Sequence, residues 1–253
     1  MTLSNPQLVV LDSADELAHD VAARLVATLG AAQANDRRAA LALTAGSIME
    51  KVWAALAEAP GSVDWSRVDV FWGDERFVPS DSSDRNDTPA ERILFAREPF
   101  SAATRYSMPP SGGEYGEDLD AAAAGYAKTL HEARRAGDDG AVPSFDVVLV
   151  GVGPDGHCCS LFPDHPSASD DSGPVIAVRD SPKPPPLRLS LSFDGLTTAR
   201  EVWVVASGDG KADAVSAALA PGADRTHVPS AGARGTDRTL WLVDADAAAK
   251  VSG

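Results

Sequence analysis

The sequence contains only two cysteines, and they are adjacent, at positions 158 and 159. Neighbouring cysteines can pair only through a strained ring, so we expect no structural disulfide. Two thiols are also too few to close a metal site without distant ligands, and we expect no metal. The simplest interpretation is that Cys158 and Cys159 are small, half-buried thiols of a protein in a reducing compartment.

Long apolar runs and basic residues are also scarce. No apolar run approaches the roughly 18 residues that a membrane-spanning helix needs, and residues 1–12 lack the features of a signal peptide, so we expect a cytoplasmic protein. The 22 basic residues are outnumbered by 37 acidic ones, for a formal net charge of −15. This charge argues against nucleic acid and acidic membranes as partners, but a few local cations can still hold a small anionic substrate.

Strand-like and helix-like segments alternate along the whole chain, and this order predicts an α/β fold. We expect strands at 7–11, 39–43, 68–72, 145–150, 175–178, 187–193, 201–206 and 240–243, and helices at 13–29, 48–59, 88–97, 119–133, 211–219 and 245–251. The pattern is that of a doubly wound, mostly parallel sheet with helices on both faces. No linker rich in glycine or serine interrupts it, so residues 1–253 are predicted to form a single domain. Alternation in 187–193 predicts that this strand has one wetter face.

Sheets of this kind bind ligands at the carboxyl ends of their strands. The first candidate segment is 44–47, after strand 39–43. Gly46 permits a tight turn, free N–H groups at the start of the next helix can hold an anion, and Thr44 and Ser47 add hydroxyl groups. Taken alone, the segment fits a plain turn capped by Ser47 better than a binding loop.

A second segment places three charges, Asp74, Glu75 and Arg76, directly after the buried strand 68–72. The Arg76 guanidinium can fork onto a phosphate while a carboxylate orients it. An exposed turn with a local salt bridge explains the same residues, so both interpretations stay open here.

Lys211 falls in the first turn of a predicted helix, after strand 201–206. A cation at this end of a helix opposes the helix dipole, and the position makes better sense if an anion lies between them. A flexible lysine that reaches solvent is the alternative.

The strongest segment is 151–157, which combines three glycines, a proline, Asp155 and His157 after the most apolar strand. A histidine near its ordinary pKa can take a proton from water at neutral pH, and Asp155 is close enough to fix its ring. A helix-capping imidazole is the weaker explanation. The glycines have the spacing of a dinucleotide-binding loop, but Pro154 removes a needed N–H and no acidic residue ends a second strand at the required distance. We therefore reject a dinucleotide site.

Together these motifs resemble the 6-phosphogluconolactonase family. Residues 151–163 are similar to the family's histidine signature, and further blocks match at 72–76, 83–86, 181–188, 210–211 and 231–232. The resemblance covers nearly the whole chain in order. It implies a fold shared with glucosamine-6-phosphate deaminases, and a hydrolase that converts 6-phospho-D-glucono-1,5-lactone to 6-phospho-D-gluconate in the pentose phosphate pathway. It implies no metal and no organic cofactor.

The motifs and the resemblance give each candidate residue a role. The expected catalytic residues are His157 as the general base, Asp155 as its orienting carboxylate, and Asp74, which positions water or sugar hydroxyls. The expected substrate-binding residues are Thr44, Gly46, Ser47, Arg76, Asn86, Gly156, Lys211, Lys183 and Arg188. Lys183 and Arg188 line the entrance in this hypothesis, and a purely structural role fits them equally. We expect a monomer or small homo-oligomer that acts on a small sugar phosphate.

The sequence departs from the family pattern in the first loop, where Ala45 replaces a glycine and Ile48-Met49 replace the common Thr-Pro, and at Cys158-Cys159. These changes concern the details of the phosphate pocket. Two alternatives remain: a deaminase-like isomerase on the same fold, and a sugar-phosphate-binding domain without activity. A deaminase needs an acidic-aromatic pair in the second block, where this chain has Asp74-Glu75-Arg76, and it favours Asn-Glu-Pro where residues 161–163 stand. A sensor within a transcription regulator needs a DNA-binding helix pair, for which the chain has no room.

Overall fold

The computed structural model describes residues 2–34, 36–135, 137–138 and 140–251, so the ends of the predicted domain 1–253 lie outside the described residues. Within these ranges, seven parallel strands form the main sheet in the order β1-β10-β9-β6-β2-β3-β5. The strands are β1 (Pro6–Leu11), β2 (Ala39–Leu43), β3 (Val68–Trp72), β5 (Thr104–Arg105), β6 (Val147–Gly151), β9 (Glu201–Ala206) and β10 (Arg238–Asp244). The predicted parallel α/β sheet is confirmed.

The order of the strands reverses at the centre of this sheet, between β2 and β6. From β2 the chain continues outward to β3, whereas from β6 it continues in the opposite direction to β9. The two strands pair through Leu41 with Val147 and Ala42 with Val148. The connections that leave their carboxyl ends diverge to opposite sides, and such a switch point leaves a crevice above the sheet edge.

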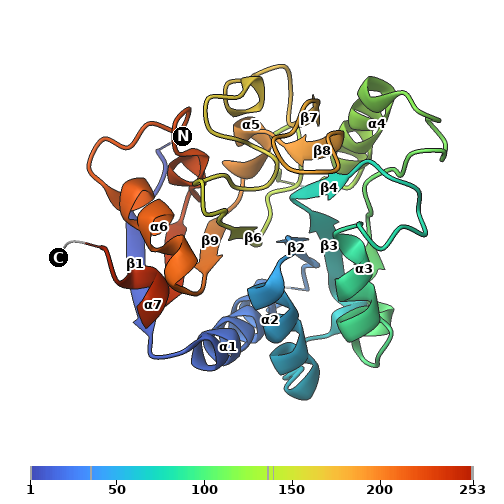
Figure 1. The fold of residues 1–253 in the computed structure, drawn as a ribbon. Coiled ribbons are helices and arrows are strands. Elements are labelled where there is room, and N and C mark those ends of the chain that lie inside the picture. Colours follow the sequence, from blue (N-terminus) through green and yellow to red (C-terminus); the bar gives the residue numbers. More distant parts are fainter. Residues whose placement is uncertain (1, 35, 136, 139, 252–253) are drawn as a thin grey trace.

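Helices cover both faces of the sheet (Figure 1). The helices are α1 (Ala14–Ala32), α2 (Ser47–Glu58), α3 (Asp87–Ala90), α4 (Leu119–Glu132), α5 (Phe193–Leu196), α6 (Ala212–Leu219) and α7 (Ala245–Ala248). In Figure 1, α1 and α2 lie side by side below the strands, and α4 lies above them. α1 begins where the sequence predicts, because the Ser13 hydroxyl accepts a hydrogen bond from the N–H of Glu16 at 3.2 Å.

Three short strands form a second, antiparallel sheet that the sequence did not predict. The strands β4 (Asp74–Arg76), β8 (Arg188–Leu191) and β7 (Val175–Val178) lie in that order. The predicted wetter face of segment 187–193 is wrong, because Ser190 is fully buried and Arg188 is 5% exposed. Their polar groups are satisfied inside the molecule: the Ser190 hydroxyl accepts from the N–H of Ser160, and Arg188 binds backbone carbonyls.

Two predicted elements end differently from the sequence pattern. The strand predicted at 187–193 stops at Leu191, because Ser192 caps α5 by accepting a hydrogen bond from the N–H of Gly195. The helix predicted at 88–97 has one α-helical turn, α3, and continues as a π-helical turn from Glu91 to Phe95.

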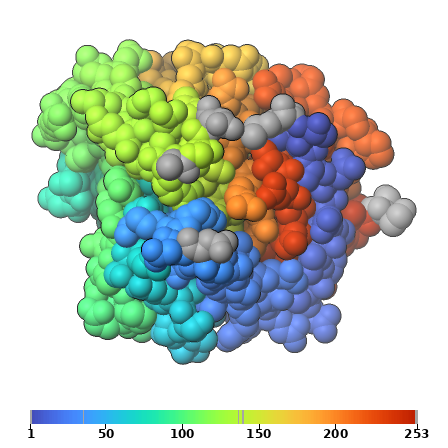
Figure 2. Space-filling model, turned by 180° about the vertical axis from the view of Figure 1, so that it is seen from behind, coloured from blue at the N-terminus to red at the C-terminus, as the bar shows by residue number. Residues whose placement is uncertain are grey.

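One hydrophobic core runs through the molecule and includes all five tryptophans, each at most 2% exposed. The chain's beginning and end meet in it, because β1 pairs with β10 along six residues. Figure 2 shows the blue amino-terminal and red carboxyl-terminal segments side by side on the rear face. In the part of the chain that the structure describes, no helix has both the length and the hydropathy to cross a membrane.

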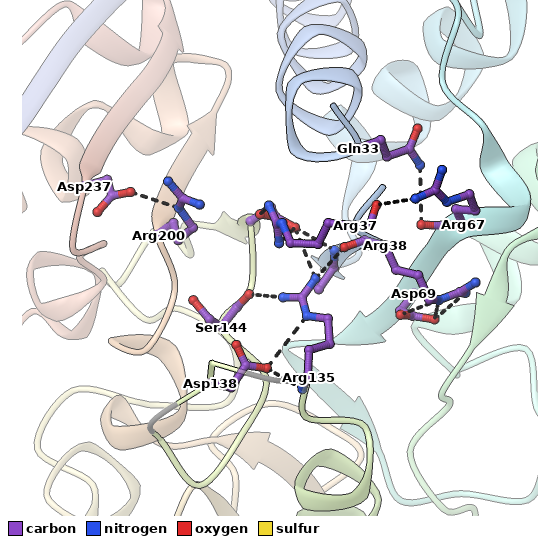
Figure 3. A network of polar contacts seen from close by, with 12 residues as sticks. Gln33, Arg37, Arg38, Arg67, Asp69, Arg135, Asp138, Ser144, Arg200 and Asp237 are labelled. Atoms are coloured by element: carbon purple, nitrogen blue, oxygen red, sulfur yellow. Dashed lines mark hydrogen bonds and ion pairs between the residues drawn. The ribbon is translucent and has the colours of Figure 1, made fainter. Parts of the chain in front are cut away.

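Arginines and carboxylates link the amino ends of the central strands (Figure 3). Arg37 and Arg135 both approach Asp146, which precedes β6 and is 3% exposed; the Arg37–Asp146 distance is 2.5 Å. Arg38 forks onto Asp69 at the start of β3. Much of the positive charge at this edge is therefore neutralised within the protein, on the side of the sheet opposite the carboxyl ends.

Candidate active site

A cavity of about 290 Å³ lies at the carboxyl ends of the central strands. Its walls come from the loops after β2, β3, β6 and β9 and from the segment that leads into β8. The lining residues are Thr44, Ala45, Gly46, Ser47, Ile48, Asp74, Arg76, Asn86, Gly151, Val152, Gly153, Pro154, His157, Cys159, Lys183, Arg188, Val205, Ser207 and Lys211. The cavity is thus at the switch point of the sheet, where parallel α/β folds bind ligands.

Ten of the twelve residues expected at the site line this cavity. The other two lie just behind its wall. Asp155 contacts the far side of the His157 ring. Gly156 has a positive φ of 86°, and its carbonyl accepts a hydrogen bond from Ser230, so it shapes the turn that carries His157.

His157 and Asp155 form a hydrogen-bonded pair. The Nδ1 atom of His157 lies 2.5 Å from Oδ1 of Asp155. Gly153 makes this arrangement possible, because a Cβ at that position would overlap both the imidazole and the carboxylate. With the Nδ1 proton held by Asp155, the lone pair of the neutral ring is on Nε2, the nitrogen that a general base needs free.

Burial favours a neutral imidazole, and the neighbouring donors favour an ionised carboxylate. Burial lowers the pKa of His157, and the positive charge of Lys183 lowers it further, against the opposite influence of Asp155. Burial alone would raise the pKa of Asp155, but hydrogen bonds from His157 and Lys183 outweigh burial and bring that pKa to about 2. The ring is therefore ready to accept a proton at neutral pH.

Lys183 is brought to this pair by the proline-rich loop before β8. Its Nζ atom lies 3.2 Å from Oδ1 of Asp155 and 3.0 Å from Nδ1 of His157. Arg188 holds the loop, because its guanidinium donates to the carbonyls of Lys183, Pro184 and Pro185. Arg188 also lines the cavity, so its wall position and its structural role coexist.

Strand β4 and the segment before α3 supply a second wall, in which Asp74, Arg76 and Asn86 meet. Asp74 is 4% exposed; it accepts hydrogen bonds from the Ser160 hydroxyl at 2.7 Å and from the Asn86 side chain at 3.2 Å. Arg76 donates to the carbonyl of Asp84 through Nη1. Among the described residues, Arg76 Nε and Asn86 Oδ1 are buried without a hydrogen-bond partner. Both residues also line the cavity, so this wall presents polar side chains to a ligand there.

The opposite wall is built to attract an anion. Gly46 caps α2 with φ of 141° and has no side chain with which to bond the first N–H groups of the helix. Those groups and the helix dipole favour a negative charge at Thr44 to Ser47. Ser47 is the first residue of α2 and not its cap, so the alternative of a turn capped by Ser47 is wrong. Burial and the neighbouring Lys183 lower the pKa of Lys211, another lining cation.

Two residues of the site were not singled out from the sequence. Ser160, which is fully buried behind the wall, fixes Asp74 from far away along the chain. Ser207 lines the cavity after β9. The position of Ser207 at a strand's carboxyl end was the available signal. Cys158 and Cys159 are unpaired thiols, but the expectation that they are half-buried is wrong, because they are 0% and 6% exposed, and burial raises the pKa of each. In the described parts of the chain, no group of three or more His, Cys, Asp or Glu residues is arranged to hold a metal ion.

Comparison with known proteins agrees with this geometry. The family model of glucosamine-6-phosphate isomerases and 6-phosphogluconolactonases matches residues 12–241. A 6-phosphogluconolactonase from Streptomyces coelicolor is 46% identical over 97% of this chain and 95% of its own. One from Mycobacterium tuberculosis is 43% identical over 96% of this chain and 97% of its own.

Solved structures show the same fold. The 6-phosphogluconolactonase of Trypanosoma brucei superposes with a TM-score of 0.83 at 27% identity, over 99% of this chain and all of that one. A monomeric glucosamine-6-phosphate deaminase shares the fold with a TM-score of 0.73 at 18% identity, over 98% of this chain and all of that one. The chain therefore belongs to the family of glucosamine-6-phosphate isomerases and 6-phosphogluconolactonases.

Proposed function

We propose that the protein is a 6-phosphogluconolactonase, which hydrolyses 6-phospho-D-glucono-1,5-lactone to 6-phospho-D-gluconate. The observation that carries the proposal is the composition of one cavity. A neutral imidazole with an orienting carboxylate forms one wall, and cations with a helix amino terminus form the others. Hydrolysis of a phosphorylated ester requires a general base that activates water and a binding site for the phosphate.

In this mechanism the phosphate binds the Thr44–Ser47 turn, Arg76 and Lys211. Backbone N–H groups and hydroxyls of the turn donate to the phosphate oxygens, and the two cations neutralise their charge. This anchoring places the lactone carbonyl next to His157. Asn86 and Asp74 contact sugar hydroxyls or water in the same wall.

His157 then accepts a proton from water and later donates it to the leaving oxygen. Its Nε2 takes a proton from water as the water oxygen bonds to the carbonyl carbon C1, and Asp155 stabilises the resulting imidazolium. Backbone N–H groups or a nearby cation stabilise the oxyanion. Collapse of this intermediate breaks the bond from C1 to the ring oxygen, and His157 returns the proton to that oxygen. The products are a free hydroxyl and a carboxylic acid, which loses its proton to solvent and becomes a carboxylate.

The substitution His157→Ala tests the general base. We expect kcat to fall about 10²–10⁴-fold, the usual contribution of such a base, while circular dichroism shows an unchanged fold. The lactone is generated in the assay by glucose-6-phosphate dehydrogenase, and the enzyme-free rate is subtracted. His131→Ala, on the surface of α4, is the matched control and keeps wild-type activity. Near-full activity of His157→Ala would overturn the role of His157.

Two further outcomes separate the alternatives. Ammonia released from glucosamine 6-phosphate would show deaminase activity, and tight binding of 6-phosphogluconate without lactone turnover would indicate a binding domain. We expect neither. We also propose that residues 1–253 act as one domain, as a monomer or small homo-oligomer without nucleic acid, in the cytoplasm. The buried, unpaired thiols at 158 and 159 suit a reducing compartment.

A further inference from the structure

Glu75 lies in the middle of β4, between Asp74 and Arg76, but its side chain does not line the cavity. It is 1% exposed. Its Oε1 atom accepts hydrogen bonds from the backbone N–H groups of Arg76 at 2.7 Å and Asn86 at 2.6 Å. Its Oε2 atom accepts from the N–H of Asp87 at 3.0 Å. One buried carboxylate therefore joins β4 to a segment eleven residues further along.

A charge in this position is costly. Burial raises the pKa of Glu75 to about 7, although Arg85 and the backbone N–H groups favour the charged form. The Arg85 guanidinium lies 3.5 Å from Oε2 of Glu75 but 2.8 Å from Asp87, which is its nearer partner. Asp87 can therefore neutralise Arg85 even when Glu75 is absent, so the charge of Arg85 alone does not explain why a glutamate is buried here.

The groups that Glu75 holds are the ones that face the ligand. Arg76 and Asn86 both line the cavity, one at the end of β4 and the other before α3. The chain leaves the site after Arg76 and returns at Asn86. The backbone N–H groups of Arg76 and Asn86 both donate to Oε1 of Glu75. These two hydrogen bonds fix the position of each residue's backbone, and hence the direction of its side chain.

We propose that Glu75 is a positioning residue that sets the spacing of Arg76 and Asn86, so that both side chains line the cavity where the phosphorylated substrate binds. The ligand named here rests on the proposed function. The spacing matters because a hydrogen bond weakens steeply once its donor and acceptor are displaced or misaligned. Glu75 acts on binding, whereas His157 acts on the proton transfer from a different loop.

Glu75→Gln tests this role. The glutamine has nearly the same shape, but its NH₂ group must face one of the N–H donors, and the charge that strengthens all three bonds is lost. We expect KM for the lactone to rise about tenfold or more, while kcat changes less than about threefold and its pH profile stays in place.

Asp87→Asn is the matched control. Asp87 belongs to the same buried cluster and pairs more closely with Arg85, but its carboxylate does not contact the backbone of Arg76 or Asn86. We expect its KM to stay within about twofold of wild type even if its melting temperature falls. Equal KM changes in Glu75→Gln and Asp87→Asn, or no change in either, would overturn the proposal.

Glu75→Asp decides the question if Glu75→Gln does not fold. It keeps the charge but withdraws the carboxylate by one methylene, and we again expect KM to rise more than kcat falls. If both Glu75 variants fail to fold while Asp87→Asn folds, Glu75 serves folding and the proposal is wrong. Calorimetry with 6-phospho-D-gluconate measures the same binding without turnover. If the wild-type protein does not turn over the lactone, the proposed function is refuted. The role of Glu75 is still tested in that case, because calorimetry compares ligand binding by the wild type and the variants.

Discussion

The substitution Asp155→Asn exchanges one carboxylate oxygen for an amide beside the His157 ring. It removes a negative charge that favours the imidazolium, and it puts an amide in place of the carboxylate whose oxygen lies 2.5 Å from Nδ1. The amide can turn its NH₂ group toward Nδ1, which leaves the proton on Nε2 and takes away the base. The change is small in volume, and Asp155 is about one-third exposed, so the fold should tolerate it.

The magnitude follows from the lost bond. A hydrogen bond to a charged group contributes about 1.5–3 kcal/mol, which corresponds to about 10- to 150-fold in rate. Inversion of the tautomer adds to this, and a buried triad that loses its carboxylate in this way loses about 10⁴-fold. We expect a loss of at least tenfold and below 10⁴-fold, because water reaches Asp155 and screens its charge.

The pH profile of kcat gives a second, independent signature. His157 must be neutral to act, so activity is lost as pH falls through its pKa, which lies below the ordinary value of 6.5. Asp155 raises that pKa, so its removal moves the acid limb of the profile to lower pH. Steady-state lactone hydrolysis, followed across this range and corrected for spontaneous opening, measures both effects.

Asp164→Asn is the matched control, because Asp164 makes the same 2.5 Å contact to Nδ1 of His227 on the surface. We expect wild-type kcat and an unchanged acid limb. The reasoning about Asp155 is refuted if Asp155→Asn keeps kcat within threefold of wild type and leaves the acid limb in place.

Three further substitutions probe the surroundings of the site. Gly153→Ala places a Cβ where the His157 imidazole lies, so we expect kcat to fall at least about tenfold; wild-type kcat would contradict the need for glycine. Lys183→Met removes a charge that lowers the pKa of His157, so the acid limb of kcat should move to higher pH, and a shift to lower pH would contradict this sign. Asp146→Asn unpairs a residue that is 3% exposed at the other end of the sheet. We expect the free energy of unfolding, measured with denaturant, to fall by about 2 kcal/mol, which is less than for a fully buried ion pair because the arginine partners are partly exposed. KM should not change, and a raised KM would show that the network affects the cavity.

Much of the site follows from local sequence patterns. Apolar strands that end in Thr44–Ser47, Asp74–Arg76 and Gly151–His157 identify the loops, and a parallel sheet brings such loops to one edge. The two-residue spacing of Asp155 and His157 was enough to anticipate their contact. The placement of these loops and this one contact are confirmed, because each depends on residues close together in the chain.

The remainder depends on pairing between distant segments. Nothing in the alternation of 187–193 shows that β8 pairs with the three-residue strand β4, and that pairing is what buries Arg188 and Ser190. Glu75 received no role from the sequence for the same reason. Its partners are backbone N–H groups, which every residue except proline carries, so no residue type in the sequence marks them. The loop that brings the N–H groups of Asn86 and Asp87 to Glu75 has no periodic pattern.

The central claim is that His157 is a neutral base with its proton on Nδ1 near pH 7. Nuclear magnetic resonance of protein labelled with ¹⁵N in its histidine rings measures both the tautomer and the titration of this residue, with His157→Ala to assign the signal. We expect the Nδ1–H tautomer and a midpoint that lies below 6.5 and coincides with the acid limb of kcat/KM, which reports the free enzyme. A ring protonated on Nε2 at neutral pH, or a midpoint unrelated to the kinetic profile, would contradict the claim.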